Sequence, residues 1–194
     1  MPTERQKCII LQSKNRDFME LLDLIQKRQS DRQYEARPVD RELVVKCLEA
    51  ARLAPSACNS QPWKFVVVDE PQLVLQVGEA AAGMGMNKFA KEVPVIVAVV
   101  LEKMNLTARI GSVIKDKEYS LLDMGIAVEN FCLQAAELGL GTCIMGWFDE
   151  KKVKKLLGIK NKRVPLLITL GYPAGETRRK IRKSLDDMSS WNKY

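Results

Sequence analysis

The sequence predicts a single-domain α+β fold, and three observations support this prediction. Four short runs rich in apolar and β-branched residues have the length of strands, and five or six longer segments repeat apolar residues with helical spacing. The chain of 194 residues is long enough to bury a substantial core. Its 46% hydrophobic and 28% charged residues are ordinary for a globular protein. We expect residues 1–16 to form a polar extension and residues 17–194 to form the domain.

The helices are predicted from apolar residues that recur every three or four positions. The predicted helical segments are residues 17–28, 40–54, 71–82, 118–138 and 149–158. Asp17, Asp40 and Asp149 are the expected N-cap residues, because a carboxylate can accept a hydrogen bond from the first turn. The longest segment carries apolar residues on two faces, which is typical of a helix in a large core or at an oligomer interface.

The strands are predicted from shorter apolar runs. They are expected within residues 63–68, 93–101, 139–147 and 164–170. The second run is nearly all apolar and predicts a strand buried on both faces. Pro165 stands near the start of the last run, where a proline is tolerated. No internal repeat or linker suggests a second domain.

Composition narrows the possible chemistry. The chain contains no histidine, which excludes a Ser-His-Asp triad and a histidine-based zinc hydrolase. The five cysteines are widely spaced and form no Cys-x-x-Cys pair, so neither a disulfide framework nor a zinc site is expected, and most should be buried free thiols. If the protein is an enzyme, a cofactor carries the chemistry.

The net charge of +7 favours an anionic partner. Basic residues cluster at 151–163 and 178–183, but aromatic residues do not interleave with them as in single-strand nucleic-acid binders. We therefore expect small phosphate-bearing ligands rather than nucleic acid. No apolar run approaches the roughly 20 residues of a membrane span, and the N-terminus lacks a signal-peptide core, so a cytoplasmic protein that does not bind membranes is expected.

Two polar segments are candidates for ligand binding. Arg28, Ser30 and Arg32 follow the first helix at alternate positions, so in an extended segment they would point the same way and converge on one anion. The alternative is a solvated charged turn. The stretch from Pro55 to Trp63 contains four polar side chains between two prolines, which suits a heterocycle with carbonyl and ring N–H groups. The alternative there is an ordinary helix-to-strand loop.

Glycine motifs for dinucleotide binding are incomplete. Gly83-x-Gly85 is followed by Lys88 where the third glycine belongs, and Gly139-x-Gly141 is followed by Ile144. We therefore reject a Rossmann fold. The sequence also contains no Gly-Lys-Ser/Thr phosphate-binding loop.

Taken together, five motifs in order resemble the FMN-dependent nitroreductase family over about residues 17–185. They are Arg28-x-Ser30-x-Arg32, Pro55-Ser56-Ala57-x-Asn59-x-Gln61-Pro62-Trp63, the Asn87 segment before Val93-Pro94-Val95, Gly139-Leu140-Gly141-Thr142-Cys143, and Leu170-Gly171-Tyr172-Pro173 before a basic tail. The resemblance implies an α/β sandwich whose central, mainly antiparallel sheet is flanked by helices. It also implies an intertwined homodimer with two FMN sites at the interface, in which the apolar tail adds to the partner's sheet.

The resemblance also implies roles for individual residues. Phosphate and ribityl contacts fall to Arg28, Ser30, Lys180 and Arg182, although five basic residues crowd the tail and leave its assignment open. Flavin-edge contacts fall to Arg32, to Asn87 and to the backbone of Ile144, Met145 and Gly146. Contacts from the other subunit fall to Pro55, Ser56 and Asn59. These assignments agree with physical chemistry, since a phosphate dianion favours several charge-assisted donors and a reduced flavin favours nearby positive charge.

The function implied is an NAD(P)H oxidoreductase that reduces nitroaromatics, quinones or related small acceptors by ping-pong kinetics. No side chain is needed as acid or base, because protons can come from solvent. The alternative is a flavin-binding protein with a storage or sensing role. A basic nucleic-acid binder, a third possibility, would be colourless and would bind with steep salt dependence.

Overall fold

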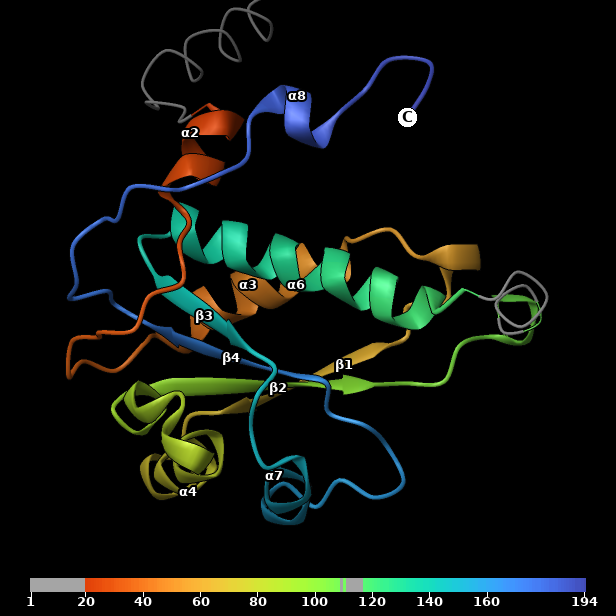
Figure 1. The fold of residues 1–194 in the computed structure, drawn as a ribbon. Coiled ribbons are helices and arrows are strands. Elements are labelled where there is room, and N and C mark those ends of the chain that lie inside the picture. Colours follow the sequence, from red (N-terminus) through yellow and green to blue (C-terminus); the bar gives the residue numbers. More distant parts are fainter. Residues whose placement is uncertain (1–19, 109, 111–116) are drawn as a thin grey trace, which may run out of the picture.

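The computed structural model describes residues 20–108, 110 and 117–194 (Figure 1). The predicted extension over residues 1–16 and the predicted N-cap Asp17 lie outside the described residues. The described helices are α2 (Leu21–Lys27), α3 (Arg41–Arg52), α4 (Pro71–Ala81), α6 (Tyr119–Glu137), α7 (Glu150–Leu156) and α8 (Leu185–Met188). Three short 3₁₀ turns are η1 (Ala57–Asn59), η2 (Gly83–Gly85) and η3 (Lys88–Lys91). The strands are β1 (Trp63–Val68), β2 (Val95–Leu101), β3 (Gly141–Met145) and β4 (Leu166–Gly171).

These elements confirm the predicted helices and strands, with differences at their ends. β2 begins at Val95 and not at Val93, because Pro94 lacks the N–H that a strand interior requires. Asp149 caps α7 as predicted, and its Oδ1 accepts a hydrogen bond from the backbone N–H of Lys152 at 2.9 Å. The prediction for Asp40 was wrong in one respect: Asp40 occupies the N-cap position, but its side chain accepts no helix N–H.

The four strands form one antiparallel sheet in the order β1-β2-β4-β3. Successive residues of β2 point to opposite faces, so Val95, Val97 and Val99 join one buried cluster and the residues between them join another. α3 and α6 cover the first face and α4 and α7 cover the second (Figure 1). This arrangement is the predicted α+β sandwich with a fully buried central strand.

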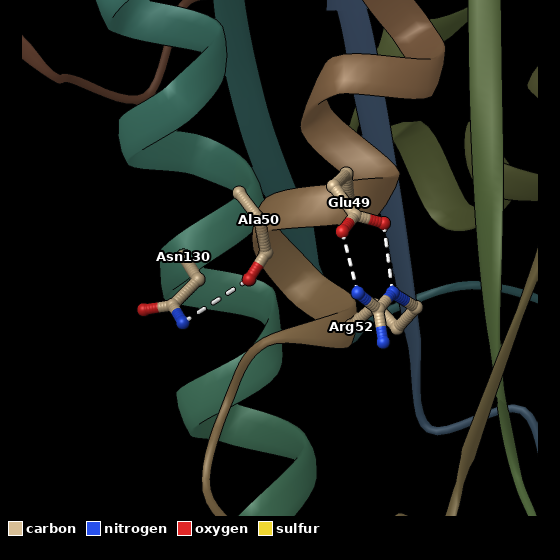
Figure 2. Close-up of polar contacts among 4 residues, drawn as sticks. All are labelled: Glu49, Ala50, Arg52 and Asn130. Atoms are coloured by element: carbon tan, nitrogen blue, oxygen red, sulfur yellow. Dashed lines mark hydrogen bonds and ion pairs between the residues drawn. The ribbon is translucent and has the colours of Figure 1, made fainter.

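A hydrogen bond joins α3 and α6, as Figure 2 shows. The carbonyl of Ala50 lies in the last turn of α3, where it lacks an intrahelical donor. The side-chain amide of Asn130 on α6 donates to this carbonyl at 3.3 Å. Nearby, both carboxylate oxygens of Glu49 accept from Arg52, at 2.7 and 2.6 Å. The first contact holds the end of α3, and with it the start of the Pro55 loop, against α6.

The edge strand β3 positions the segment between α2 and α3. Ser30 and Thr142 form an isolated parallel bridge, and the Asp31 N–H donates to the Thr142 carbonyl at 2.8 Å. The hydroxyl of Tyr34 donates to the Asp31 carbonyl at 2.8 Å. Residues 28–34 therefore run beside β3 and leave the basic residues of this segment at the sheet edge. None of the helices in the described part of the chain could span a membrane.

Candidate functional site

A cavity of about 380 Å³ lies between the Arg28–Arg32 segment and the C-terminal tail. Its lining residues are Arg28, Gln29, Ser30, Arg32, Arg178, Arg179, Lys180, Ile181 and Arg182. Six of these side chains are basic, and none of the described lining residues is acidic. We call this cavity the basic pocket. It brings together the sequence-predicted residues Arg28, Ser30, Arg32, Lys180 and Arg182, which are separated by about 150 positions in the chain.

Arg28 carries a feature that an anion would relieve. Its Nε lies 3.3 Å from Glu129 Oε1 on α6, within ion-pair distance. The geometry is not that of a hydrogen bond, and this buried Nε has no hydrogen-bond partner among the described residues. A buried donor without an acceptor costs about 1–3 kcal/mol. An anion in the basic pocket would lie beside this incompletely hydrogen-bonded guanidinium.

The tail closes the basic pocket through contacts with the backbone of the N-terminal segment. Arg178 Nη2 donates to the Ser30 carbonyl, and Lys180 Nζ donates to the carbonyls of Ile25 and Arg28 at the end of α2. Partial burial, together with the nearby charges of Arg28 and Arg182, lowers the pKa of Lys180 from its usual value. An anion bound in this pocket would offset the crowding of like charges.

Arg32 contacts a different element from Arg28. Its guanidinium carbon lies 6.0 Å from the ring centroid of Phe89 in η3, and its Nη1 donates to the Ser30 carbonyl at 3.4 Å. Arg28 instead reaches α6. The two arginines therefore reach toward different parts of the site, although both line the basic pocket.

The predicted flavin-edge residues meet at the far end of β3. Asn87 has a left-handed backbone with φ 50°, and its Nδ2 donates to the Trp147 carbonyl at 2.8 Å. Gly146 and Trp147 line a second cavity of about 480 Å³. The side chain of Met145 is buried, so any contact from this residue would come from its backbone. Thr142, beside the basic pocket, and Gly146, just past the end of β3, are four positions apart, which is about 13 Å of extended chain. An elongated ligand along β3 could reach both ends.

The Pro55 loop lies elsewhere in the same chain. The loop that carries Pro55, Ser56 and Asn59 follows α3 and lies beside the start of α6. The segment after α2, whose residues line the basic pocket, lies toward the opposite end of α6 (Figure 1). The Ala57 N–H donates to the buried Asp123 carboxylate on α6 at 3.0 Å, and Ser56 Oγ accepts the Gln61 N–H at 2.9 Å. A single subunit therefore does not bring these three residues to the basic pocket. The resemblance assigned them to the site of the other subunit.

Three of the four described cysteines are buried, which makes them unsuited to nucleophilic chemistry at neutral pH. Cys47, Cys132 and Cys143 are buried free thiols, as predicted, and Cys58 is an exposed free thiol. Burial raises the pKa of Cys47 to about 12 and of Cys132 to about 11. These two thiols stay protonated, since the thiolate is the reactive form. Cys8 lies outside the described residues.

Four residues that line the basic pocket were not among those predicted from the sequence: Gln29, Arg178, Arg179 and Ile181. Arg178 and Arg179 line the basic pocket, but the tail assignment was left open because five basic residues stand in six positions. Gln29 lies between the motif residues and also lines the pocket. Gln29 was not predicted, because in an extended segment its side chain is expected to point away from those of Arg28 and Ser30.

The structure is that of an α+β protein with a cationic pocket at one edge of an antiparallel sheet. Comparison with known proteins makes the class specific: residues 25–172 match the Nitroreductase family. The chain belongs to this family. This family match ends at residue 172, before the basic tail.

Three similar proteins illustrate the relationship. A Thermus thermophilus protein named NADH dehydrogenase is 30% identical over 192 residues, which cover 85% of this chain and 92% of that protein. An oxygen-insensitive NADPH nitroreductase of Helicobacter pylori strain J99 is 30% identical over 172 residues, covering 74% of this chain and 82% of that protein. The solved structure of an FMN-dependent nitroreductase from Clostridium difficile R20291 superposes with a TM-score of 0.73 at 25% identity, covering 90% of this chain and all of that one.

Proposed function

We propose that the protein is an FMN-dependent oxidoreductase that uses NADH or NADPH to reduce nitroaromatic, quinone or related small organic acceptors. The observation that carries the proposal is the basic pocket, with six cationic side chains and a buried Arg28 Nε that lacks an acceptor. The relatives named for NADH, NADPH and FMN point to the same chemistry. A phosphate group would satisfy the unpaired donor and offset the clustered charge.

The residues present fit FMN along β3. Arg28, Ser30, Lys180 and Arg182 would hold its phosphate and ribityl chain, with Arg178 and Arg179 closing the pocket. Arg32 and Asn87 would face the edge of the flavin, and the backbone of Ile144, Met145 and Gly146 would pass beside the ring. FMN held there would supply the hydride and electron-transfer chemistry between the nicotinamide and the acceptor.

The chain's own residues would contribute electrostatics and orientation rather than acid–base catalysis. The guanidinium of Arg32 stays charged at any physiological pH, so it favours negative charge at the flavin edge. With no histidine in the chain, protons would come from solvent. Because the sequence contains no second nucleotide-binding motif, NAD(P)H and the acceptor would use the same site in turn. Such ping-pong kinetics predict parallel double-reciprocal plots.

We also propose a cytoplasmic, intertwined homodimer with two sites. Large apolar side chains are exposed on α2, on α6 and along the tail, including Leu22, Leu122, Ile126 and Trp191. A partner subunit would cover such surfaces. The same partner would bring its Pro55, Ser56 and Asn59 to the basic pocket, which one subunit does not do.

The visible spectrum of the purified protein tests the proposal. We expect a yellow protein that releases FMN, not FAD, on heat denaturation and then oxidises NADH or NADPH in the presence of quinones or nitroaromatics. A yellow protein that releases FMN but turns over neither nicotinamide with any acceptor would instead support a storage or sensing role. A colourless protein that binds no flavin would contradict both.

A further inference from the structure

The tail that closes the basic pocket is fastened by one side chain of the N-terminal segment, that of Gln29. Its Oε1 accepts the backbone N–H of Arg178 at 3.0 Å. Its Nε2 donates to the Glu176 carbonyl at 3.3 Å. The Arg178 and Lys180 side chains of the tail donate the opposite way, to backbone carbonyls of the N-terminal segment, and the Ala174 N–H donates to the Gln33 carbonyl at 3.0 Å. Gln29 therefore fixes the tail's backbone rather than its side chains.

Gln29 is itself held by Asp31. The Gln29 Nε2 donates to Asp31 Oδ1 at 2.8 Å, which sets the orientation of the amide and leaves Oε1 facing Arg178. Asp31 is only 7% exposed. Its backbone is fixed on both sides, by the Thr142 carbonyl and by the Tyr34 hydroxyl, each at 2.8 Å. A buried carboxylate so anchored is a rigid acceptor for the Gln29 amide.

Gly141 makes room for this arrangement. A Cβ atom at position 141 would lie 2.6 Å from Asp31 Oδ2, so the carboxylate packs directly on the backbone at the start of β3. Burial raises the pKa of Asp31 overall. The hydrogen bond from Gln29 and the charges of Arg178 and Arg28 act in the opposite direction, because they stabilise the ionised carboxylate. One negative charge beneath the pocket thus eases the repulsion between cations that the tail brings together.

We propose that Asp31 and Gln29 are positioning residues that clamp residues 176–182 over the Arg28–Arg32 segment. Through this clamp they set the preference of the site for a phosphorylated flavin over an unphosphorylated one. The proposal rests on the proposed FMN function for its ligand, but the clamp itself is a property of the chain. Neither residue need touch the cofactor.

The test compares Gln29→Ala with Gln72→Ala, which truncates an exposed glutamine in the first turn of α4 as a matched control. Two readouts are used: hydrogen exchange of backbone amides 176–180 in the flavin-free protein, and the dissociation constants of FMN and riboflavin. We expect Gln29→Ala to speed exchange in the tail and to weaken FMN about tenfold, which corresponds to one or two lost hydrogen bonds. Riboflavin affinity should change less than twofold, because riboflavin has no phosphate.

A second variant checks that Asp31 acts through Gln29. Asp31→Ala should speed exchange in the tail as Gln29→Ala does, and exchange in the double variant should differ from that of Gln29→Ala by no more than twofold, because the two residues form one unit in the clamp. Exchange is the readout compared here, because Asp31→Ala also removes a negative charge beside the cations of the pocket. Thermal unfolding of every variant shows whether it folds, and Gln29→Ala, at a half-buried position, keeps the proposal testable if Asp31→Ala does not fold.

Three outcomes would overturn the proposal. The first outcome is that Gln29→Ala and Gln72→Ala show the same hydrogen-exchange rates in the tail and the same preference for FMN over riboflavin. The second is a released tail with the preference for FMN unchanged. The third outcome is that Gln29→Ala loses the preference for FMN over riboflavin while the tail amides stay protected from hydrogen exchange. That result would make Gln29 a direct ligand of FMN. A wild-type protein that fails to discriminate FMN from riboflavin would refute the phosphate role in the proposed function, while exchange in the tail would still decide whether the clamp exists.

Discussion

Arg28 and Arg32 lie in one short motif but contact different elements, and this difference separates their expected roles. Arg28 reaches α6 and carries the buried Nε without an acceptor. Arg32 lies over Phe89 in η3, next to the Asn87 end of the site. At the scale of single residues, one arginine is therefore suited to a permanent anion and the other to charge that develops during reduction.

Substitution of the two arginines should separate these roles. Arg28→Ala should mainly weaken FMN binding. Arg32→Met should leave much of the affinity for oxidised FMN and lower its reduction potential, since a unit charge near 4 Å is worth about 1–4 kcal/mol, or roughly 20–90 mV for a two-electron couple. Affinity and midpoint potential are measured for both variants. If Arg32→Met loses FMN as severely as Arg28→Ala with an unmoved potential, both arginines are phosphate ligands.

Lys180 predicts a pH dependence of FMN affinity. Its pKa is lowered from 10.5 in the free protein by burial and by the cations Arg28 and Arg182. A bound phosphate dianion would raise that pKa, so binding takes up a proton. The contribution of Lys180 is therefore complete below the lowered pKa of the free protein and is lost as the pH rises through the raised pKa of the complex. Titrations on the alkaline side of neutrality should show affinity falling in the wild type.

Lys180→Arg is the matched control for that titration, because arginine keeps its charge over the same range. Its FMN affinity should stay nearly flat where that of the wild type declines. An equal alkaline decline in both proteins would assign the pH dependence to another group.

At the scale of elements, the packing of α4 on η3 positions Asn87 and Phe89. A Cβ atom at Gly78 in α4 would lie 2.3 Å from the Ala90 carbonyl oxygen in η3. Gly78→Ala should therefore push the two elements apart and destabilise the protein by about 1–3 kcal/mol, the usual range for overpacking. Chemical denaturation measures this change. Gly83→Ala serves as the control, since a Cβ there has no neighbour within 4 Å, and similar stabilities of the two variants would contradict the prediction.

The main helices and strands could be predicted from the sequence because their periodicity is local. Alternate residues of β2 enter two different cores, which is why an almost wholly apolar run indicated a central strand. Asp40 occupies the predicted N-cap position without the expected side-chain hydrogen bond, because a residue type favours capping without ensuring it. The single turn α8 has too few residues to show a helical period.

The candidate site was predictable in part. The alternation of Arg28, Ser30 and Arg32 marked one wall of the basic pocket. The second wall depends on contacts such as Arg178 with Ser30, which are 148 positions apart, and no local pattern encodes their pairing. Gln29 and Asp31 escaped notice for the same reason: their importance arises from a tail that the sequence places far away.

At the scale of the whole molecule, the proposed dimer predicts that one face of α6 is essential for cofactor binding. Leu122 and Ile126 are 58% and 42% exposed on this helix. A carboxylate introduced at position 126 would lose its hydration when two subunits associate, which is costly. Ile126→Glu should therefore yield a monomer, and FMN binding should weaken because the partner's residues are missing from the site. Light scattering and a flavin titration measure the two effects. Leu75→Glu is the control, because Leu75 is 47% exposed on α4, in the opposite layer. A monomeric Ile126→Glu variant that keeps full FMN affinity would refute an intersubunit site.

The central claim is that the basic pocket holds the phosphate of FMN, and equilibrium binding of FMN and riboflavin to the flavin-free wild-type protein tests it most directly. Several charge-assisted hydrogen bonds, each worth about 1.5–3 kcal/mol, should favour FMN by at least about 100-fold at low salt. Added salt should narrow this difference, because it screens exposed charges. Equal affinities for FMN and riboflavin at low salt would contradict the account.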